Sequence, residues 1–185
     1  MTRPLRIAFH GAARTVTGSR HLLSYGEWSW LYDCGLYQGR RDEADAINRT
    51  FRFDPKRLDA VVVSHAHLDH TGNLPTLVSQ GFRGRIHLTN ASADLARVML
   101  PDSAHLMERD VEHVNRHRRS RPLRKPLYSV EDVTRTIERF ETYGYGKSFE
   151  LFPNVTATWH DAGHILGSAM TTFTFTQNGR SFRLL

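Results

Sequence analysis

Short apolar runs bounded by glycine, asparagine or charged residues recur along the chain, and they predict strands. In the first half, strands are predicted over residues 5–9, as a pair within residues 20–33 that turns near Gly26, over residues 58–63 and over residues 85–89. In the last third, strands are predicted over residues 149–152, 155–160, 170–176 and 182–185, the last after a turn at Asn178 and Gly179.

Apolar residues at intervals of three and four predict helices between these strands. The first covers residues 74–80 and is suited to end at Gly81. A long helix begins near Ala91, and its predicted apolar positions are Leu95, Val98, Met99, Leu106, Val111 and Val114. The last helix is predicted over residues 129–143, because Ser129 opens a capping box. Strand-rich blocks separated by helices indicate a mixed α/β layered fold with the helices packed outside.

The composition is that of an ordinary globular protein and supports one domain, with 185 residues of which 39% are hydrophobic and 24% charged. No window approaches the ~18 consecutive apolar residues of a membrane span, and the N-terminal apolar run is too short for a signal peptide. The single cysteine, Cys34, excludes an internal disulfide and is interpreted as a small buried residue. These features predict a cytoplasmic protein.

The formal net charge of +6 comes from one segment, residues 116–125, which we call the basic arm. Its basic residues are Arg116, Arg118, Arg119, Arg121, Arg124 and Lys125, and without them basic and acidic residues are equal in number. Such a run attracts RNA or DNA through phosphate contacts and counterion release. A solvated connection between two helices explains the charge equally well, so both interpretations stay open.

The segment SHAHLDH, residues 64–70, follows the predicted strand over residues 58–63 directly. His65 and His67 would point in nearly opposite directions on a helix, but they can converge from a loop at the end of a strand. Asp69 and His70 are predicted to follow on the same loop, and they add a carboxylate and another imidazole. This donor set suits zinc or a similar divalent ion. Six further histidines are isolated and are interpreted as surface or core residues: His10, His21, His87, His105, His113 and His117.

Two more polar residues at predicted strand ends are candidates for this site. His164 lies between Gly163 and Gly167, and these glycines suit a tight loop close to a ligand. Asp33 can orient an imidazole by accepting its second N–H, although a turn-forming aspartate is an equal alternative. On spacing alone, both assignments stay open.

Four segments in this order resemble a known family: GAARTVTGS, LYDCGLYQG, HLDHTGNLP and DAGHILGSA. SHAHLDH resembles the His-x-His-x-Asp-His signature of the metallo-β-lactamase fold. Together the segments resemble its β-CASP branch, the nucleic-acid-processing branch that includes RNase J and the nuclease subunit of the pre-mRNA cleavage and polyadenylation machinery. The resemblance covers nearly the whole chain, and it implies an αββα sandwich with the metals at one edge of two packed sheets.

By position, the resemblance implies that His65, His67 and His164 hold one zinc ion. It implies that Asp69 and His70 hold part of a second, and that Asp33 is an orienting partner. Two such ions activate a shared water for attack on phosphorus. Asp69 and His70 are therefore the expected catalytic residues, with Asp69 as the proton acceptor.

The chain departs from the family pattern at its C-terminal end. In β-CASP enzymes the strand equivalent to residues 181–185 continues into a Gly-Asp turn whose aspartate bridges the metals, and an inserted β-CASP domain and further histidines follow. We therefore expect residues 1–185 to be the N-terminal part of a longer enzyme, or a truncated product, and to bind fewer than two zinc ions. The leading hypothesis is a zinc-dependent nuclease acting on single-stranded RNA, with DNA as an open alternative. A small-molecule hydrolase of the same fold, such as a thioesterase or lactonase, and a non-catalytic binding module are the other hypotheses.

Overall fold

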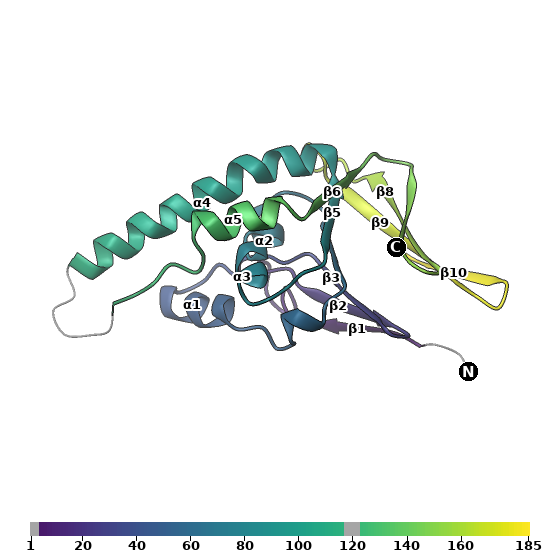
Figure 1. Cartoon of the computed structure of the whole chain (residues 1–185), viewed down its shortest axis with the longest axis horizontal. Coiled ribbons are helices and arrows are strands. Elements are labelled where there is room, and N and C mark those ends of the chain that lie inside the picture. The colour runs from purple at the N-terminus through teal and green to yellow at the C-terminus, as the bar shows by residue number, and fades with distance from the viewer. Residues whose placement is uncertain (1–3, 117–122) are drawn as a thin grey trace.

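The computed structural model describes residues 4–116 and 123–185, which form two β-sheets and a set of helices (Figure 1). In chain order the elements are β1 (Leu5–Phe9), β2 (His21–Tyr25), β3 (Trp28–Tyr32), α1 (Arg41–Arg49), the 3-10 helix η1 (Pro55–Arg57), β4 (Ala60–Val62), α2 (Leu68–Thr71), α3 (Leu74–Ser79), β5 (Arg85–Thr89), α4 (Asn90–Arg116), α5 (Val130–Ile137), β6 (Phe140–Tyr143), β7 (Ser148–Phe152), β8 (Val155–Asp161), β9 (Ala169–Gln177) and β10 (Arg180–Leu184).

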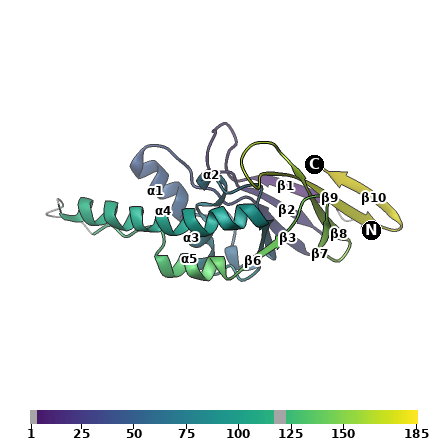
Figure 2. The same cartoon turned by 90° about the horizontal axis from the view of Figure 1, so that it is seen from above.

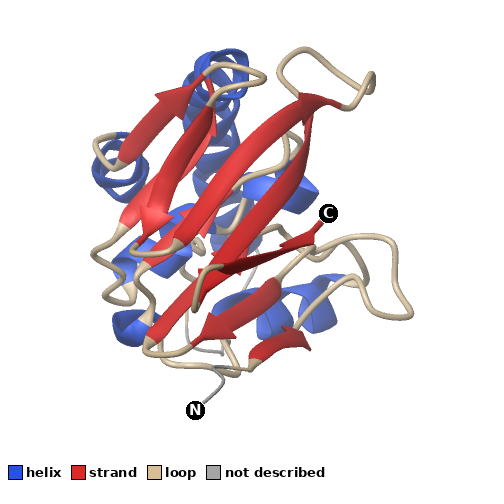
Figure 3. Ribbon diagram, turned by 90° about the vertical axis from the view of Figure 1, so that its right-hand side faces the viewer, coloured by secondary structure: helices blue, strands red, loops and turns tan. Residues whose placement is uncertain are grey.

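The larger sheet has the strand order β1-β2-β3-β4-β5-β6, and the smaller one has the order β10-β9-β8-β7. β1, β2 and β3 form an antiparallel meander, whereas β3, β4, β5 and β6 run parallel to one another. Parallel neighbours need crossover connections, and the helices supply them on one side of the sheets (Figures 1 and 3). The carboxyl ends of β3, β4 and β5 therefore meet at one edge of the larger sheet, which is where open α/β sheets bind ligands.

Adjacent residues of the central strands are buried in different cores. Trp30 and Val62 pack between the two sheets, where they meet aromatic residues of the smaller sheet: Phe152, Trp159, Phe173 and Phe175. Leu31 and Val61 pack instead under the helices, against α3. Because both faces of β4 are covered, its sequence is an unbroken apolar run, as is usual for buried parallel strands.

The outer face of the smaller sheet has no helix against it in the described part of the chain (Figure 1). Alternate residues of β8 and β9 are buried, and the positions between them are mostly threonines: Thr156, Thr158, Thr172, Thr174 and Thr176. The described residues thus form an α, a β and a second β layer of the implied αββα sandwich. Among the described residues, no helix combines the length and the apolar character that crossing a bilayer requires.

The helix predicted over residues 129–143 ends earlier than its apolar spacing indicated. The Ser129 side chain accepts the N–H of Asp132 as a capping box requires, but α5 ends at Ile137. Phe140–Tyr143 form β6, which pairs in parallel with β5. Pairing with a buried strand therefore outweighs the continued three-and-four spacing.

The long helix α4 forms as predicted, but its buried face differs from the predicted one. Val98 and Leu106 are 70% and 59% exposed, whereas the buried side chains are mostly small: Ser92, Ala93, Ala96, Leu100, Ser103 and Ala104. Small side chains let α4 lie close to its neighbours. Seen from above, α4 runs away from the sheets, so its two ends lie far apart (Figure 2).

Candidate metal centre

The segment that carries the first two histidines connects β4 to α2. The N–H of Val63 still donates to the His87 carbonyl at 2.9 Å, and His67 is the N-cap residue of α2. The prediction of a loop is therefore confirmed for His65 and His67. It is wrong for Asp69 and His70, which lie within α2 because the chain turns into a helix directly after His67.

Three histidines from two distant segments converge beside this connection. The ligand atoms of His65, His67 and His164 lie within 4.8 Å of one another. Nδ1 of His67 lies 3.1 Å from Nε2 of His65 and 3.3 Å from Nε2 of His164. A tetrahedral ion with Zn–N bonds of about 2.0–2.1 Å holds its ligand nitrogens about 3.3 Å apart, so these spacings fit such an ion. Among residues 4–116 and 123–185, these histidines form the one cluster of three such donors.

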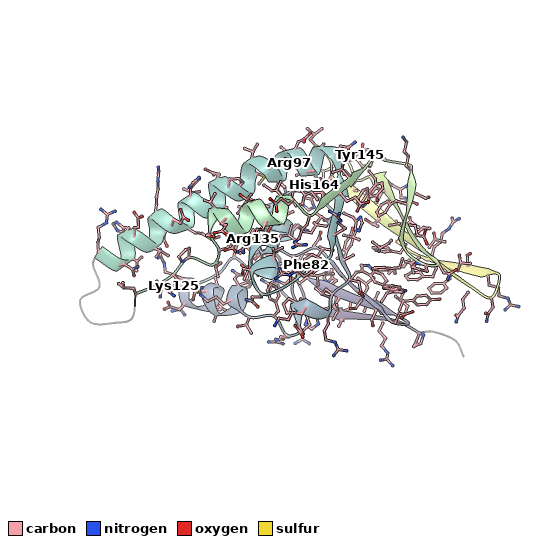
Figure 4. All side chains as sticks on the ribbon, in the orientation of Figure 1. Phe82, Arg97, Lys125, Arg135, Tyr145 and His164 are labelled. Carbon is pink, nitrogen blue, oxygen red and sulfur yellow. The ribbon has the colours of Figure 1, made fainter. Side chains whose placement is uncertain are left out.

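The loop that carries His164 is tied to the beginning of α4. The hydroxyls of Thr89 and Ser92 donate to the Gly167 carbonyl at 2.7 and 2.9 Å. Gly167 has a φ of +82°, and a Cβ there would lie 2.5 Å from the Ser92 nitrogen, so the close approach requires glycine. These contacts bring His164 to the beginning of α4 (Figure 4).

Ser168 belongs to the same loop and fixes it by hydrogen bonds to the backbone of that loop. Its Oγ accepts the N–H of His164 at 3.1 Å and that of Ile165 at 3.2 Å. The next residue, Ala169, donates its N–H to the Ser64 carbonyl at 2.8 Å. This bond joins the smaller sheet to the segment of the first two histidines, so the three imidazoles are held by one backbone framework.

Asp33 follows β3 and is buried, with 2% of its surface exposed. Its Oδ1 accepts the Ser64 N–H at 2.8 Å, and its Oδ2 accepts the Ser64 hydroxyl at 3.0 Å and Nδ1–H of His70 at 2.7 Å. Because the Ser64 hydroxyl donates to Asp33, it accepts Nδ1–H of His65 at 3.0 Å. Nε2 of His65 and Nε2 of His70 therefore keep their lone pairs for a metal, as an orienting carboxylate would arrange.

Asp69 and His70 lie beside the three-histidine cluster without being part of it. The His70 ring centroid is 4.0 Å from that of His65, and Nε2 of His70 is 3.7 Å from Oδ2 of Asp69. These two atoms can supply two ligands to a neighbouring ion. The assignment of a second metal to them stays a prediction.

Comparison with protein families decides what kind of chain this is. Residues 29–167 match the model of the Metallo-beta-lactamase superfamily. The chain belongs to this superfamily. Solved metallo-β-lactamases share its fold. MEM-A1, a subclass B3 enzyme from a soil metagenome library, matches with a TM-score of 0.52 at 17% identity, and the match covers 90% of this chain and 55% of the MEM-A1 chain. SMB-1 has a TM-score of 0.52 at 19% identity, with 91% and 56% covered.

Curated relatives of this metallo-β-lactamase-superfamily chain include nucleic-acid proteins. A ribonuclease of Thermus thermophilus is 36% identical over 165 residues, which are 89% of this chain and 34% of that protein. Transcription termination factor FttA of Methanocaldococcus jannaschii is 30% identical over 166 residues, which are 90% of this chain and 24% of that protein. The chain thus spans about a third or less of the length of these relatives.

The environment of this superfamily member's histidines shifts their pKa values in opposite directions. Burial, together with the neighbouring His70, lowers the pKa of His65 to about 4, so the imidazole is neutral and able to bind a metal at pH 7. Burial also acts to lower the pKa of His70. The hydrogen bond to Asp33 and the charges of Asp33 and Asp69 outweigh it, so the pKa of His70 is raised.

Backbone contacts fix α2 against the segments that precede β2 and follow β3. The N–H of Cys34 donates to the His70 carbonyl at 2.7 Å, and the N–H of Ser19 donates to the Asp69 carbonyl at 2.8 Å. A Cβ on Gly35 would lie 1.6 Å from the Asp69 oxygen, so only glycine allows this approach. Cys34 is fully buried, and burial raises the pKa of its thiol to about 12, as expected for a structural cysteine.

Three of the predicted nucleic-acid contacts, Arg116, Arg124 and Lys125, are described, and they lie at the other end of α4 from the histidines. Arg118, Arg119 and Arg121 fall outside the described residues. Arg116 lies 3.9 Å from Glu112 and is 73% exposed, and Arg124 forms an ion pair with Asp42. Figure 4 shows Lys125 near the C-terminal end of α4 and His164 near its N-terminal end. An α-helix rises about 1.5 Å per residue, so the 27 residues of α4 separate the two regions by about 40 Å.

Proposed function

We propose that this chain forms the metal-binding part of a zinc-dependent nuclease of β-CASP type, which cleaves single-stranded RNA. The convergence of His65, His67 and His164 carries the proposal, because it supplies three imidazole nitrogens at the carboxyl edge of a parallel sheet. The ribonuclease and termination-factor relatives favour a nucleic acid over a small-molecule substrate. DNA, the cytoplasmic location and the place of residues 1–185 in a longer enzyme stay predictions.

The residues fit a two-metal hydrolysis. His65, His67 and His164 would hold one ion, and Asp69 and His70 would contribute to the second. Zinc in such a site supplies a water of lowered pKa and neutralises the charge that develops on the phosphoryl oxygens.

The chain's own residues then supply orientation and proton transfer. The carboxylate of Asp69 accepts the proton of the attacking water as the new P–O bond forms and the bond to the leaving oxygen breaks. Asp33 holds His70 by its Nδ1–H, so that Nε2 faces Asp69. Ser64 holds His65 by the same type of contact.

A single substitution tests the proposal. In the full-length gene product, His67→Ala removes the ligand atom that lies closest to both other histidines, and we expect cleavage of a labelled single-stranded RNA to fall by about a thousandfold or more. The same variant of the 185-residue chain should bind zinc at least about a hundredfold more weakly in calorimetry. His105→Ala, at an exposed position of α4, is the matched control and should change neither value. Cleavage by His67→Ala at the wild-type rate would contradict the metal mechanism.

A further inference from the structure

A cavity of about 530 Å³ lies between the β1–β2 connection (residues 10–20), α1 and residues 50–53. Its volume is within the range of about 300–1,000 Å³ that is usual for small-ligand pockets. None of the predicted metal ligands lines it. Aromatic and cationic side chains do: Phe9, Tyr37, Phe51, Phe53, His10, Arg20 and Arg52.

The inner wall of the cavity includes a fixed cation. Arg20 is 3% exposed, and its guanidinium donates to the Gly35 carbonyl at 3.1 and 3.0 Å and to the amide oxygen of Asn48 at 2.8 Å. Its guanidinium carbon also lies 5.2 Å from the centroid of the Phe51 ring. Among the described residues, neutral oxygens accept all of its hydrogen bonds, so no carboxylate cancels its charge.

The rim adds a second cation. Arg52 is exposed and, within the described ranges, forms no ion pair. His10 also lines the cavity, and its pKa is lowered by burial and by the charges of Arg52 and Arg20. The one carboxylate in the lining, Glu43, accepts a hydrogen bond from the Tyr37 hydroxyl at 3.3 Å. With two arginines and one glutamate, the lining carries a net positive charge.

The β1–β2 connection lines this cavity and carries unpaired backbone donors. Ala12, Arg14 and Gly18 have φ values of 50°, 63° and 80°, in the left-handed region. In the described structure, the N–H groups of residues 11–16 and of Gly18 donate to no protein acceptor. Successive free N–H groups around left-handed residues form concave sites for anions.

The aromatic side chains offer surfaces for a base. Phe9 is 66% exposed at the end of the edge strand β1. Phe53 lies with its ring centroid 5.2 Å from that of His10 and 5.3 Å from that of Phe51. Phe53 is half-buried, so it offers only part of its ring. Accessible aromatic rings next to arginines that form no ion pair are the usual platform for bases of single-stranded nucleic acid.

We propose that this cavity binds one nucleotide of the RNA substrate, with its phosphate at the free N–H groups and Arg52 and its base against Phe9 and Phe53. The proposal rests on the proposed function, since it names a place where the substrate strand is held. Ser19, at the end of the β1–β2 connection, donates its N–H to the Asp69 carbonyl and its hydroxyl to Asp33 at 3.1 Å. The bound nucleotide therefore lies beside the metal centre, whereas the described residues of the basic arm, such as Arg116 and Lys125, lie at the far end of α4.

RNA binding without metal tests this site separately from cleavage. Fluorescence anisotropy of a labelled oligouridylate with the 185-residue chain in EDTA should give a dissociation constant about tenfold higher for Phe9→Ser, with an unchanged salt slope. Arg52→Gln should also weaken binding and should reduce the salt slope by about one. Arg57→Gln, an exposed arginine outside the cavity, is the control and should bind as the wild type does. Equal dissociation constants for all four proteins would overturn the proposal, whatever the cleavage assay shows.

A mononucleotide separates phosphate from base recognition. Under metal-free conditions, 5′-UMP at saturating concentration should raise the pKa of His10 in an NMR titration, because a bound anion stabilises the imidazolium. Uridine, which has no phosphate, should leave the pKa of His10 where it is. An unchanged pKa of His10 with 5′-UMP would place the phosphate elsewhere and overturn the proposal.

Discussion

The carboxyl edge of the parallel strands and the C-terminal end of α4 both gather titratable side chains, but the two regions hold them differently. At the edge, main-chain bonds such as Ser19 to Asp69 and Ala169 to Ser64 fix segments far apart in the sequence. At the C-terminal end of α4, contacts are made by exposed side chains, such as Arg41 with Asp110, which are 55% and 52% exposed.

The difference follows from what each region has to do. The ligand nitrogens of a metal site must keep their positions to within a few tenths of an ångström. Only packed backbone and buried hydrogen bonds hold side chains that accurately. A polyanion needs only positive charge at a suitable distance, which mobile side chains supply. We therefore expect substitutions at the edge to have large effects on stability and zinc affinity, because they disturb the backbone. Substitutions at the C-terminal end of α4 should have small effects on stability.

The largest effect on stability is expected from substitution of Gly35, which has no side chain that could bind a metal or transfer a proton. Gly35→Ala would place a Cβ 1.6 Å from the Asp69 oxygen and 2.1 Å from its carbonyl carbon, so backbone must move. We expect a loss of about 3 kcal/mol or more in the free energy of unfolding, measured by urea denaturation, together with weaker zinc binding. Gly144→Ala, where an added Cβ meets nothing within 4 Å, is the control. Equal stability of the two variants would show that α2 can shift freely.

A smaller effect is expected from Asp33, whose charge can be removed while its shape is kept. Asp33 has a φ of 60°, a conformation that asparagine tolerates, so Asp33→Asn should fold. It should lower zinc affinity by about 10- to 100-fold, the usual cost of losing an orienting partner.

The same variant has a predicted pH signature. The raised pKa of His70 means that its imidazolium stabilises the fold below the unfolded pKa of about 6.5, and this contribution is lost as pH rises through the folded pKa. Without the Asp33 charge, burial should dominate and the pKa of His70 should fall, as an NMR titration can follow. Asp94→Asn, on an exposed part of α4, should leave it unchanged. An unshifted pKa of His70 in Asp33→Asn would show that Asp69 alone raises it.

Spacing along the sequence predicted the local part of the candidate site, whereas it left the long-range part open. His65, His67, Asp69 and His70 are adjacent in the chain, so their chemistry could be predicted from spacing. His164 lies 97 residues from His67, and on spacing it remained open until the family resemblance supported it.

The supporting contacts left no signal in the sequence, because each depends on which segments pack together. Gly167 reaches Ser92 across 75 residues, and nothing in either neighbourhood indicates the other. Arg20 and Arg52 come from separate segments, and neither is part of a recognisable motif. The cavity that they line could therefore not be predicted.

The same reason explains the errors in the fold. α1 was missed because Asn48, a polar residue, is its buried side chain, so its apolar pattern is weak. The buried face of α4 was predicted wrongly, because its predicted apolar positions include Val98. Val98 is exposed, and small residues pack on the buried face instead. Phe140 continues a helical spacing but pairs with Ile86 in the sheet.

The smallest effect on stability is expected from the ion pair between Arg41 and Asp110, near the C-terminal end of α4. Arg41 donates two hydrogen bonds to Asp110, at 2.8 and 3.0 Å, in good geometry. Because both side chains are more than half exposed, water and salt screen the pair, and a double-mutant cycle with Arg41→Ala and Asp110→Ala should give a coupling of about 0.2–1 kcal/mol. The coupling should shrink further in 1 M salt, where the screening length is only about 3 Å. The Arg97 and Asp94 pair, also exposed on α4, should behave in the same way. A salt-independent coupling above about 2 kcal/mol would mean that this region is held as firmly as the metal edge, and the contrast between the two would fail.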